Sequence, residues 1–125
     1  MYSDLLGKPF AWGGRGPESY DCFGLCKEVF RRKGIELPDY QSNPEFQIID
    51  ERLAEGRSKY LLEIDKAENG CIVLFKIKPP FVSHIGVMVN ATQFIHITQK
   101  SSVSVERVDS LLWANKVHGF YRFIQ

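Results

Sequence analysis

Three residues of this sequence carry side chains that can perform nucleophilic catalysis together: Cys22, His84 and His96. A thiolate attacks carbonyl carbons, and an imidazole can take the thiol proton, either during attack or beforehand in a thiolate–imidazolium pair. A second imidazole can hydrogen bond to the other ring nitrogen and fix its tautomer, although it orients a base more weakly than a carboxylate does. The residue types therefore predict Cys22 as nucleophile, His84 as general base and His96 as orienting residue.

Cys22 stands where a helix is expected to begin. Asp21 is a typical N-cap residue, and the apolar spacing that follows predicts a helix over 22–33, stopped by Gly34. Unpaired N–H groups and the helix dipole favour an anion at this position, which helps a thiol whose ordinary pKa is ~8.5. Because Cys22 also opens the apolar stripe of the helix, a small core residue is the alternative interpretation.

The two histidines lie in neighbouring segments that alternate like strands, so their meeting depends on the turn between them. An odd turn, such as three residues over 89–91, would pair His84 directly with His96 and bring their Cβ atoms to ~4.5–5.5 Å. A turn of two or four residues would place His96 on the opposite face. The catalytic interpretation therefore requires an odd turn, with Gly86 leaving space for the incoming helix end.

The remaining sequence places helices first and strands afterwards. A loop rich in glycine and proline is expected over 9–20 and a second helix over 45–60. Segments rich in β-branched and aromatic residues predict strands at 71–78, 83–89, 93–98, 103–108 and 117–124. This order indicates an α+β fold in which N-terminal helices pack on an antiparallel sheet of five to six strands, in one domain over 1–125.

Composition and charge exclude several classes of function. Lys+Arg is 16 and Asp+Glu is 15, so no basic field is present to attract nucleic acid. No apolar run approaches the length of a membrane span, and the first residues lack the basic head and apolar core of a signal peptide. We therefore expect no nucleic-acid partner, no membrane span and no export signal.

Metal binding is an alternative use of the same side chains. Cys22 and Cys26 are one helical turn apart, and with His84 and His96 they supply ligand types found in zinc sites. However, Cys26 falls in the middle of the apolar stripe, and the sequence has no second cysteine pair. We expect no metal and no cofactor, and we interpret His118 as a structural or surface residue.

Around these residues the sequence resembles the NlpC/p60 family of cysteine peptidases, which have a papain-like fold. The similar segments, in the family's order, are 9–14, 21–25, 69–75, 84–87 and 94–96. Residues 21–25 are similar to the family's Asp-Cys-Ser-Gly nucleophile motif, and 84–87 to its His-Val-Gly segment. The resemblance implies a peptidoglycan hydrolase that cleaves stem peptides, between D-glutamate and the diamino acid.

The resemblance also implies a set of substrate-binding residues, namely Phe10, Trp12, Asp21, Phe23 and Ser83. Phe10 departs from the family, which often has a tyrosine whose hydroxyl helps hold the oxyanion; the Cys22 N–H is the simplest remaining donor. Phe23 replaces a serine that lines the substrate site in relatives. Asp21 is expected to face the substrate, as in relatives that bind a free amine, besides capping the helix.

Within this family the sequence is similar to tail-associated proteins of phages and prophages, through Phe23, 34–40 and 119–122. This implies other phage tail proteins as partners, with synthesis in the bacterial cytoplasm and action in the virion tail or cell wall. Two alternatives remain: an acyltransferase or amidase on the same scaffold, and an inactive tail structural or wall-binding module. The aromatic residues at positions 10 and 23 favour the inactive module.

Overall fold

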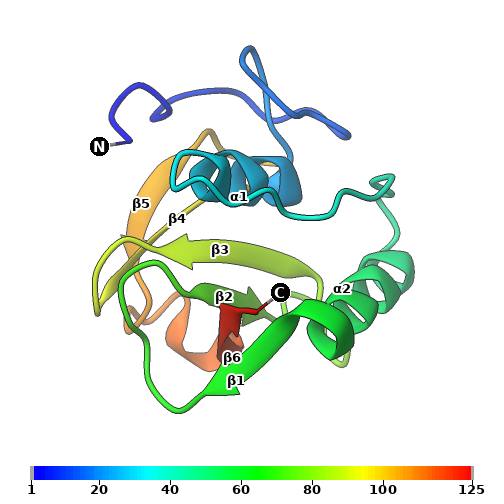
Figure 1. Ribbon diagram of the computed structural model, residues 1–125, viewed down its shortest axis with the longest axis vertical. Coiled ribbons are helices and arrows are strands. Elements are labelled where there is room, and N and C mark those ends of the chain that lie inside the picture. The colour runs from blue at the N-terminus through cyan, green and yellow to red at the C-terminus, as the bar shows by residue number, and fades with distance from the viewer. Residues whose placement is uncertain (1, 125) are drawn as a thin grey trace.

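A six-stranded antiparallel sheet forms the centre of the fold, as seen in a computed structural model that describes residues 2–124 (Figure 1). The strands are β1 Leu61–Ile64, β2 Ile72–Phe75, β3 His84–Met88, β4 Gln93–His96, β5 Ser104–Arg107 and β6 Val117–Phe123. Their order across the sheet is β1-β6-β2-β3-β4-β5. The predicted α+β fold with N-terminal helices and an antiparallel sheet is confirmed.

Two helices, α1 Cys22–Arg31 and α2 Phe46–Tyr60, precede the strands. The Asp21 side chain accepts a hydrogen bond from the Gly24 N–H at 2.7 Å, so Asp21 is the N-cap that its residue type predicts. The first helix ends two residues earlier than expected, and the second begins one residue later. Neither helix within residues 2–124 is long and apolar enough to cross a bilayer.

β1 was not predicted from the sequence. This strand has four residues and follows α2 directly, so neither a turn signal nor a long alternation announces it. It forms an edge of the sheet by pairing with β6, from Leu61 opposite Phe123 to Ile64 opposite Phe120. Tertiary pairing, and not local sequence preference, defines this strand.

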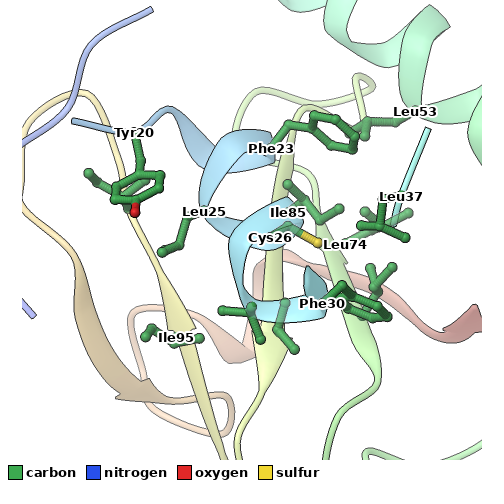
Figure 2. Close-up of a cluster of buried hydrophobic side chains, with 14 of the residues drawn as sticks. Tyr20, Phe23, Leu25, Cys26, Phe30, Leu37, Leu53, Leu74, Ile85 and Ile95 are labelled. Carbon is green, nitrogen blue, oxygen red and sulfur yellow. The ribbon is translucent and has the colours of Figure 1, made fainter. Parts of the chain in front are cut away.

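Buried side chains gather on both faces of the sheet. The cluster between the sheet and the helices includes Leu25 and Phe30 of α1 and Leu74 and Ile85 of the sheet (Figure 2). A second cluster on the other face joins Cys71, Val73, Phe75, Met88, Phe94 and Trp113. All five residues of β3 are therefore buried, and alternate residues of β3 contribute to different clusters.

The glycine-rich loop before α1 packs directly on the first turn of that helix. The Asp21 N–H donates to the Gly14 carbonyl at 3.2 Å. A Cβ atom built on Gly24 would lie 1.9 Å from the same carbonyl oxygen, far inside van der Waals contact. Residue 24 therefore has to be glycine for the loop to reach the start of α1.

This close approach predicts opposite effects for two helical Gly→Ala substitutions. Gly24→Ala should lower the free energy of unfolding by about 1–3 kcal/mol, because the loop has to move away from α1. Gly56→Ala in α2 is the matched control, since its Cβ would meet nothing within 4 Å. It should raise the free energy of unfolding by about 0.5–1 kcal/mol. Urea unfolding measures both, and equal effects would contradict the packing of the loop on Gly24.

Candidate active site

The turn between β3 and β4 decides whether the two imidazoles meet. The Val89 N–H donates to the Gln93 carbonyl at 2.9 Å, so three residues, 90–92, form the turn. The Asn90 side-chain oxygen accepts from the N–H groups of Thr92 and Gln93, at 2.9 and 2.8 Å. The turn is therefore odd, as catalysis requires, but Asn90 starts it one residue later than 89–91.

This later turn changes the partner of each histidine. Val87 pairs with Ile95, so His96 falls opposite Gly86 and lies diagonally across from His84 on the same face. The expected direct pairing of His84 with His96 is wrong. The space over Gly86 is also filled from β4 and not by the helix end, since a Cβ there would lie 3.4 Å from the His96 Cβ.

The two imidazoles nevertheless form a hydrogen-bonded relay that continues onto a third strand. His84 Nε2 lies 2.8 Å from His96 Nδ1, and His96 Nε2 lies 2.5 Å from Glu106 Oε2. The other oxygen of Glu106 accepts from Trp113 Nε1 at 2.9 Å. The relay thus crosses from β3 to β5 and ends in a carboxylate whose side chain keeps 34% of its surface exposed.

Sequence reasoning missed Glu106. The register of β4 and β5 places Glu106 opposite Phe94 and Ser104 opposite His96, so Glu106 shares a face with His96. Its alternation with Ser104 was the only local signal. The length of the connection between β4 and β5 does not fix how the two strands pair. The alternation alone therefore could not identify Glu106 as the partner of His96.

Burial sets the charge state of the relay. The rings of Trp113 and Phe75 have centroids 5.8 and 5.4 Å from that of His84, and the Trp113 centroid lies 4.8 Å from that of His96. Burial, followed by the neighbouring His96, lowers the pKa of His84 to about 3. Burial also lowers the pKa of His96, and the hydrogen bond to Glu106 opposes that shift. Both rings are therefore neutral near pH 7.

Cys22 is the first residue of α1, and this helix packs on β3, the strand that begins at His84. Cys22 is partly exposed, yet burial, followed by the Asp21 charge, raises the pKa of its thiol to about 12. Hydrogen bonding from the backbone of Ile85, the residue after His84, opposes this shift.

The Cys22 thiol and the imidazole of His84 are not joined by a hydrogen bond in this structure. Within residues 2–124, no hydrogen bond joins the Cys22 thiol to either imidazole. The bond to His96 uses Nε2 of His84, which leaves Nδ1 for the thiol proton. Of the two resting states left open by the sequence, the pKa shifts favour a neutral thiol beside a neutral imidazole.

The carboxylate of Asp21 is fully occupied by groups of this chain. Oδ1 accepts from the Gly24 N–H at 2.7 Å and from Arg15 Nη1 at 2.9 Å, and Oδ2 accepts from the Gly13 N–H at 3.0 Å and from the Ser42 hydroxyl. These four bonds use the acceptor sites of a carboxylate, and Asp21 is only 2% exposed. The structure therefore leaves no place on Asp21 for a substrate amine.

Arg15, which the sequence analysis did not single out, joins two loops at this point. Besides Asp21, its guanidinium pairs with Asp39 at 3.0 Å and donates to the Tyr40 carbonyl at 3.0 Å and to Ser42 Oγ at 3.1 Å. One side chain thus ties the glycine-rich loop to residues 39–42 and holds the cap of α1.

The other residues expected to bind substrate have different surroundings. Phe23 is buried, stacks on Tyr40 with ring centroids 4.3 Å apart, and points towards Leu53 of α2 (Figure 2). It therefore packs in the core, and its contact with substrate stays a prediction. The Ser83 side chain is also buried, and no group within residues 2–124 hydrogen bonds to its hydroxyl.

Two aromatic residues of the glycine-rich loop remain as candidate contacts. Phe10 is partly buried and meets Trp12 edge-on, with ring centroids 4.9 Å apart. Trp12 is 42% exposed. Among the five residues expected to bind substrate, Trp12 offers the largest apolar surface to a ligand.

The metal-binding alternative gains no support from this geometry. Among residues 2–124, no three side chains of the ligating types lie where they could hold an ion. Cys26, one of the four side chains considered, is 1% exposed in the core cluster between α1 and the sheet (Figure 2).

Comparison with known proteins identifies the family. The model of the NlpC/P60 family matches residues 7–122. The chain belongs to the NlpC/P60 family. It is 31% identical over 117 residues, 94% of its length, to the probable endopeptidase p60 of Listeria innocua. It is 25% identical over 117 residues to the murein DD-endopeptidase MepS/murein LD-carboxypeptidase of Escherichia coli K12.

These relatives are longer proteins. The chain spans 22% of the Listeria protein and 56% of the Escherichia coli protein. Among solved structures, an NLP/P60-family protein similar to a lipoprotein from Staphylococcus aureus has a TM-score of 0.72 and 23% identity, over 97% of this chain and 38% of its own. The NlpC/p60 domain of the peptidoglycan hydrolase SagA has a TM-score of 0.63 and 21% identity, over 95% of this chain and 89% of that one. Both structures share the fold.

The raised pKa of Cys22 and the lowered pKa of His84 predict the pH dependence of alkylation. With a thiol pKa of about 12, the thiolate fraction of the free protein should rise about tenfold per pH unit between about pH 6 and 9. Iodoacetamide labelling followed by mass spectrometry measures this rate. Cys22→Ala gives the background from the two buried cysteines. A fast rate that stays flat between about pH 5 and 8 would instead show a preformed ion pair.

Proposed function

We propose that this chain is a cysteine peptidase that cleaves amide bonds in peptidoglycan stem peptides, between D-glutamate and the diamino acid. The observation that carries the proposal is the His84–His96–Glu106 relay, together with Cys22 at the start of α1, the helix that packs on β3. Membership of the NlpC/P60 family supports it, as do relatives named as endopeptidases and a peptidoglycan hydrolase.

The proposed reaction proceeds through a thioester. As the Cys22 sulfur attacks the amide carbonyl, Nδ1 of His84 takes the thiol proton. The imidazolium then gives this proton to the leaving amine, and the carbon–nitrogen bond breaks. In the second half, His84 takes a proton from water, the resulting hydroxide attacks the thioester, and the proton returns to sulfur. The products are a free amine and a carboxylic acid.

Backbone N–H groups stabilise the oxyanion in this proposal. The first turn of α1 presents unpaired N–H groups beside the sulfur, and the Cys22 N–H is the nearest in sequence. Phe10 has no hydroxyl to add a further donor. Loss of one oxyanion donor costs ~10²–10³ in rate, so turnover should be slow compared with an enzyme that keeps such a hydroxyl.

Substrate recognition in this proposal does not use Asp21. Its carboxylate is occupied by Arg15, Ser42 and two backbone N–H groups, so a free amino terminus on the substrate gains no ion pair there. The proposed substrates therefore include stem peptides whose amino terminus is blocked by the bond to the glycan. Trp12 provides exposed aromatic surface for contacts with the peptide.

Hydrolysis of purified muropeptides tests the function. The wild type should release products with a new amine and a new carboxylate, from substrates with free and N-acetylated amino termini alike. Cys22→Ala should form no product, whereas Cys71→Ala, a matched change at a buried cysteine, should retain activity. Equal product from wild type and Cys22→Ala would remove Cys22 from the reaction.

The same assay separates the alternative functions. Transfer of the acyl group to an added amine, with little free acid, would indicate an acyltransferase. Absence of product from every substrate, together with binding to intact cell walls, would indicate an inactive wall-binding module.

We also propose, from the sequence likeness of residues 34–40 and 119–122, that the protein acts as a phage tail component. Two residues of the first segment, Asp39 and Tyr40, contact Arg15 and Phe23 beside the start of α1, so the segment contributes to the site. Mass spectrometry of particles induced from the source strain should detect the chain among tail proteins. Its absence from purified particles would contradict this role.

A further inference from the structure

The order of hydrogen-bonding groups in the relay fixes where each proton lies. A carboxylate accepts hydrogen bonds and donates none, so at 2.5 Å from Glu106 Oε2 the Nε2 atom of His96 carries the proton. A neutral imidazole has one N–H, so Nδ1 of His96 is an acceptor. Nε2 of His84, at 2.8 Å from that acceptor, then donates to it, and Nδ1 of His84 holds a lone pair.

We propose that Glu106 is a positioning residue that sets the tautomers of both imidazoles and so makes Nδ1 of His84 the general base. Only the predicted effect on turnover rests on the proposed function, because the tautomers can be measured without substrate. Trp113 supports this role by donating to the second carboxylate oxygen, which holds Glu106 in place. Glu106 never touches the thiol and acts through two rings.

The relay also compensates for the weak orienting effect of a neutral imidazole. When His84 takes a proton, its Nε2–H bond to His96 strengthens, and His96 in turn draws on the charge of Glu106. The carboxylate thus contributes to holding the imidazolium without lying next to it. The buried aromatic surroundings of both rings keep water from replacing these bonds.

An ordinary surface ion pair is the competing explanation for Glu106, since its side chain is partly exposed. The two explanations differ for Glu106→Gln, which keeps shape but adds an NH₂ group. The Trp113 N–H requires an acceptor, so the amide oxygen turns to Trp113 and the NH₂ faces His96. His96 must then accept at Nε2, donate from Nδ1 to His84 and leave Nδ1 of His84 protonated.

Nitrogen NMR of ¹⁵N-histidine-labelled protein reads these tautomers directly. The chain has three histidines, so His118 serves as an internal reference outside the relay. At pH 7 the wild type should show Nε2–H tautomers for His84 and His96. Glu106→Gln should show Nδ1–H tautomers for both, while Glu106→Asp, which retains a carboxylate, should keep the wild-type pattern. An Nδ1–H tautomer of His84 in the wild type overturns the proposal, even if no variant folds.

The kinetic test uses a second substitution. Glu106→Gln should slow muropeptide hydrolysis by on the order of 10²-fold, because Nδ1 of His84 can no longer take the thiol proton. Trp113→Phe removes the N–H that fixes the amide orientation, so Glu106→Gln/Trp113→Phe should recover part of that loss relative to Trp113→Phe alone. Unchanged rates in Glu106→Gln, or no recovery in the double variant, overturn the proposal.

These readouts separate failure of this inference from failure of the proposed function. The tautomers can be measured without peptidoglycan, so they can confirm the role of Glu106 even where muropeptides are not cleaved. Conversely, cleavage by the wild type together with unchanged tautomers in Glu106→Gln would retain the peptidase and remove Glu106 from its relay.

Discussion

The register of β3, β4 and β5 fixes where His84, His96 and Glu106 stand relative to one another. Each residue comes from a different strand, and their side chains meet because the strands alternate in phase on one face of the sheet. The turn at Asn90 fixes the register of β4 on β3, and the pairing of Phe94 with Glu106 fixes the register of β5 on β4. The site therefore depends on strand pairing more than on any single loop.

The nucleophile is positioned by a separate set of contacts. Asp21 caps α1, Arg15 and Ser42 hold Asp21, and Gly24 lets the preceding loop lie against the helix. These contacts hold the start of α1, the helix that packs on β3 and so on the strand that carries His84. The thiol and the imidazoles thus come from two separately held elements, α1 and the sheet, which suits a pair that stays neutral at rest and exchanges its proton during attack.

Sequence alone supplied much of this arrangement, and its failures have physical causes. The cap at Asp21, the helix after it and the strands around His84 and His96 follow from local patterns. Glu106 and Arg15 do not, because their partners are distant in sequence and depend on register and loop packing. The burial of Phe23 does not follow from local patterns either, because Tyr40, on which it stacks, lies in a different segment of the chain.

The path of the relay across three strands has a consequence for how this domain tolerates insertions and deletions. Adding or removing one residue within β3, β4 or β5 reverses every side chain beyond that point and separates the rings from the carboxylate. Length changes in the exposed residues 99–102, between β4 and β5, leave the ladder of strands intact. Variation in length among homologous domains should therefore accumulate in the connections and spare these strands.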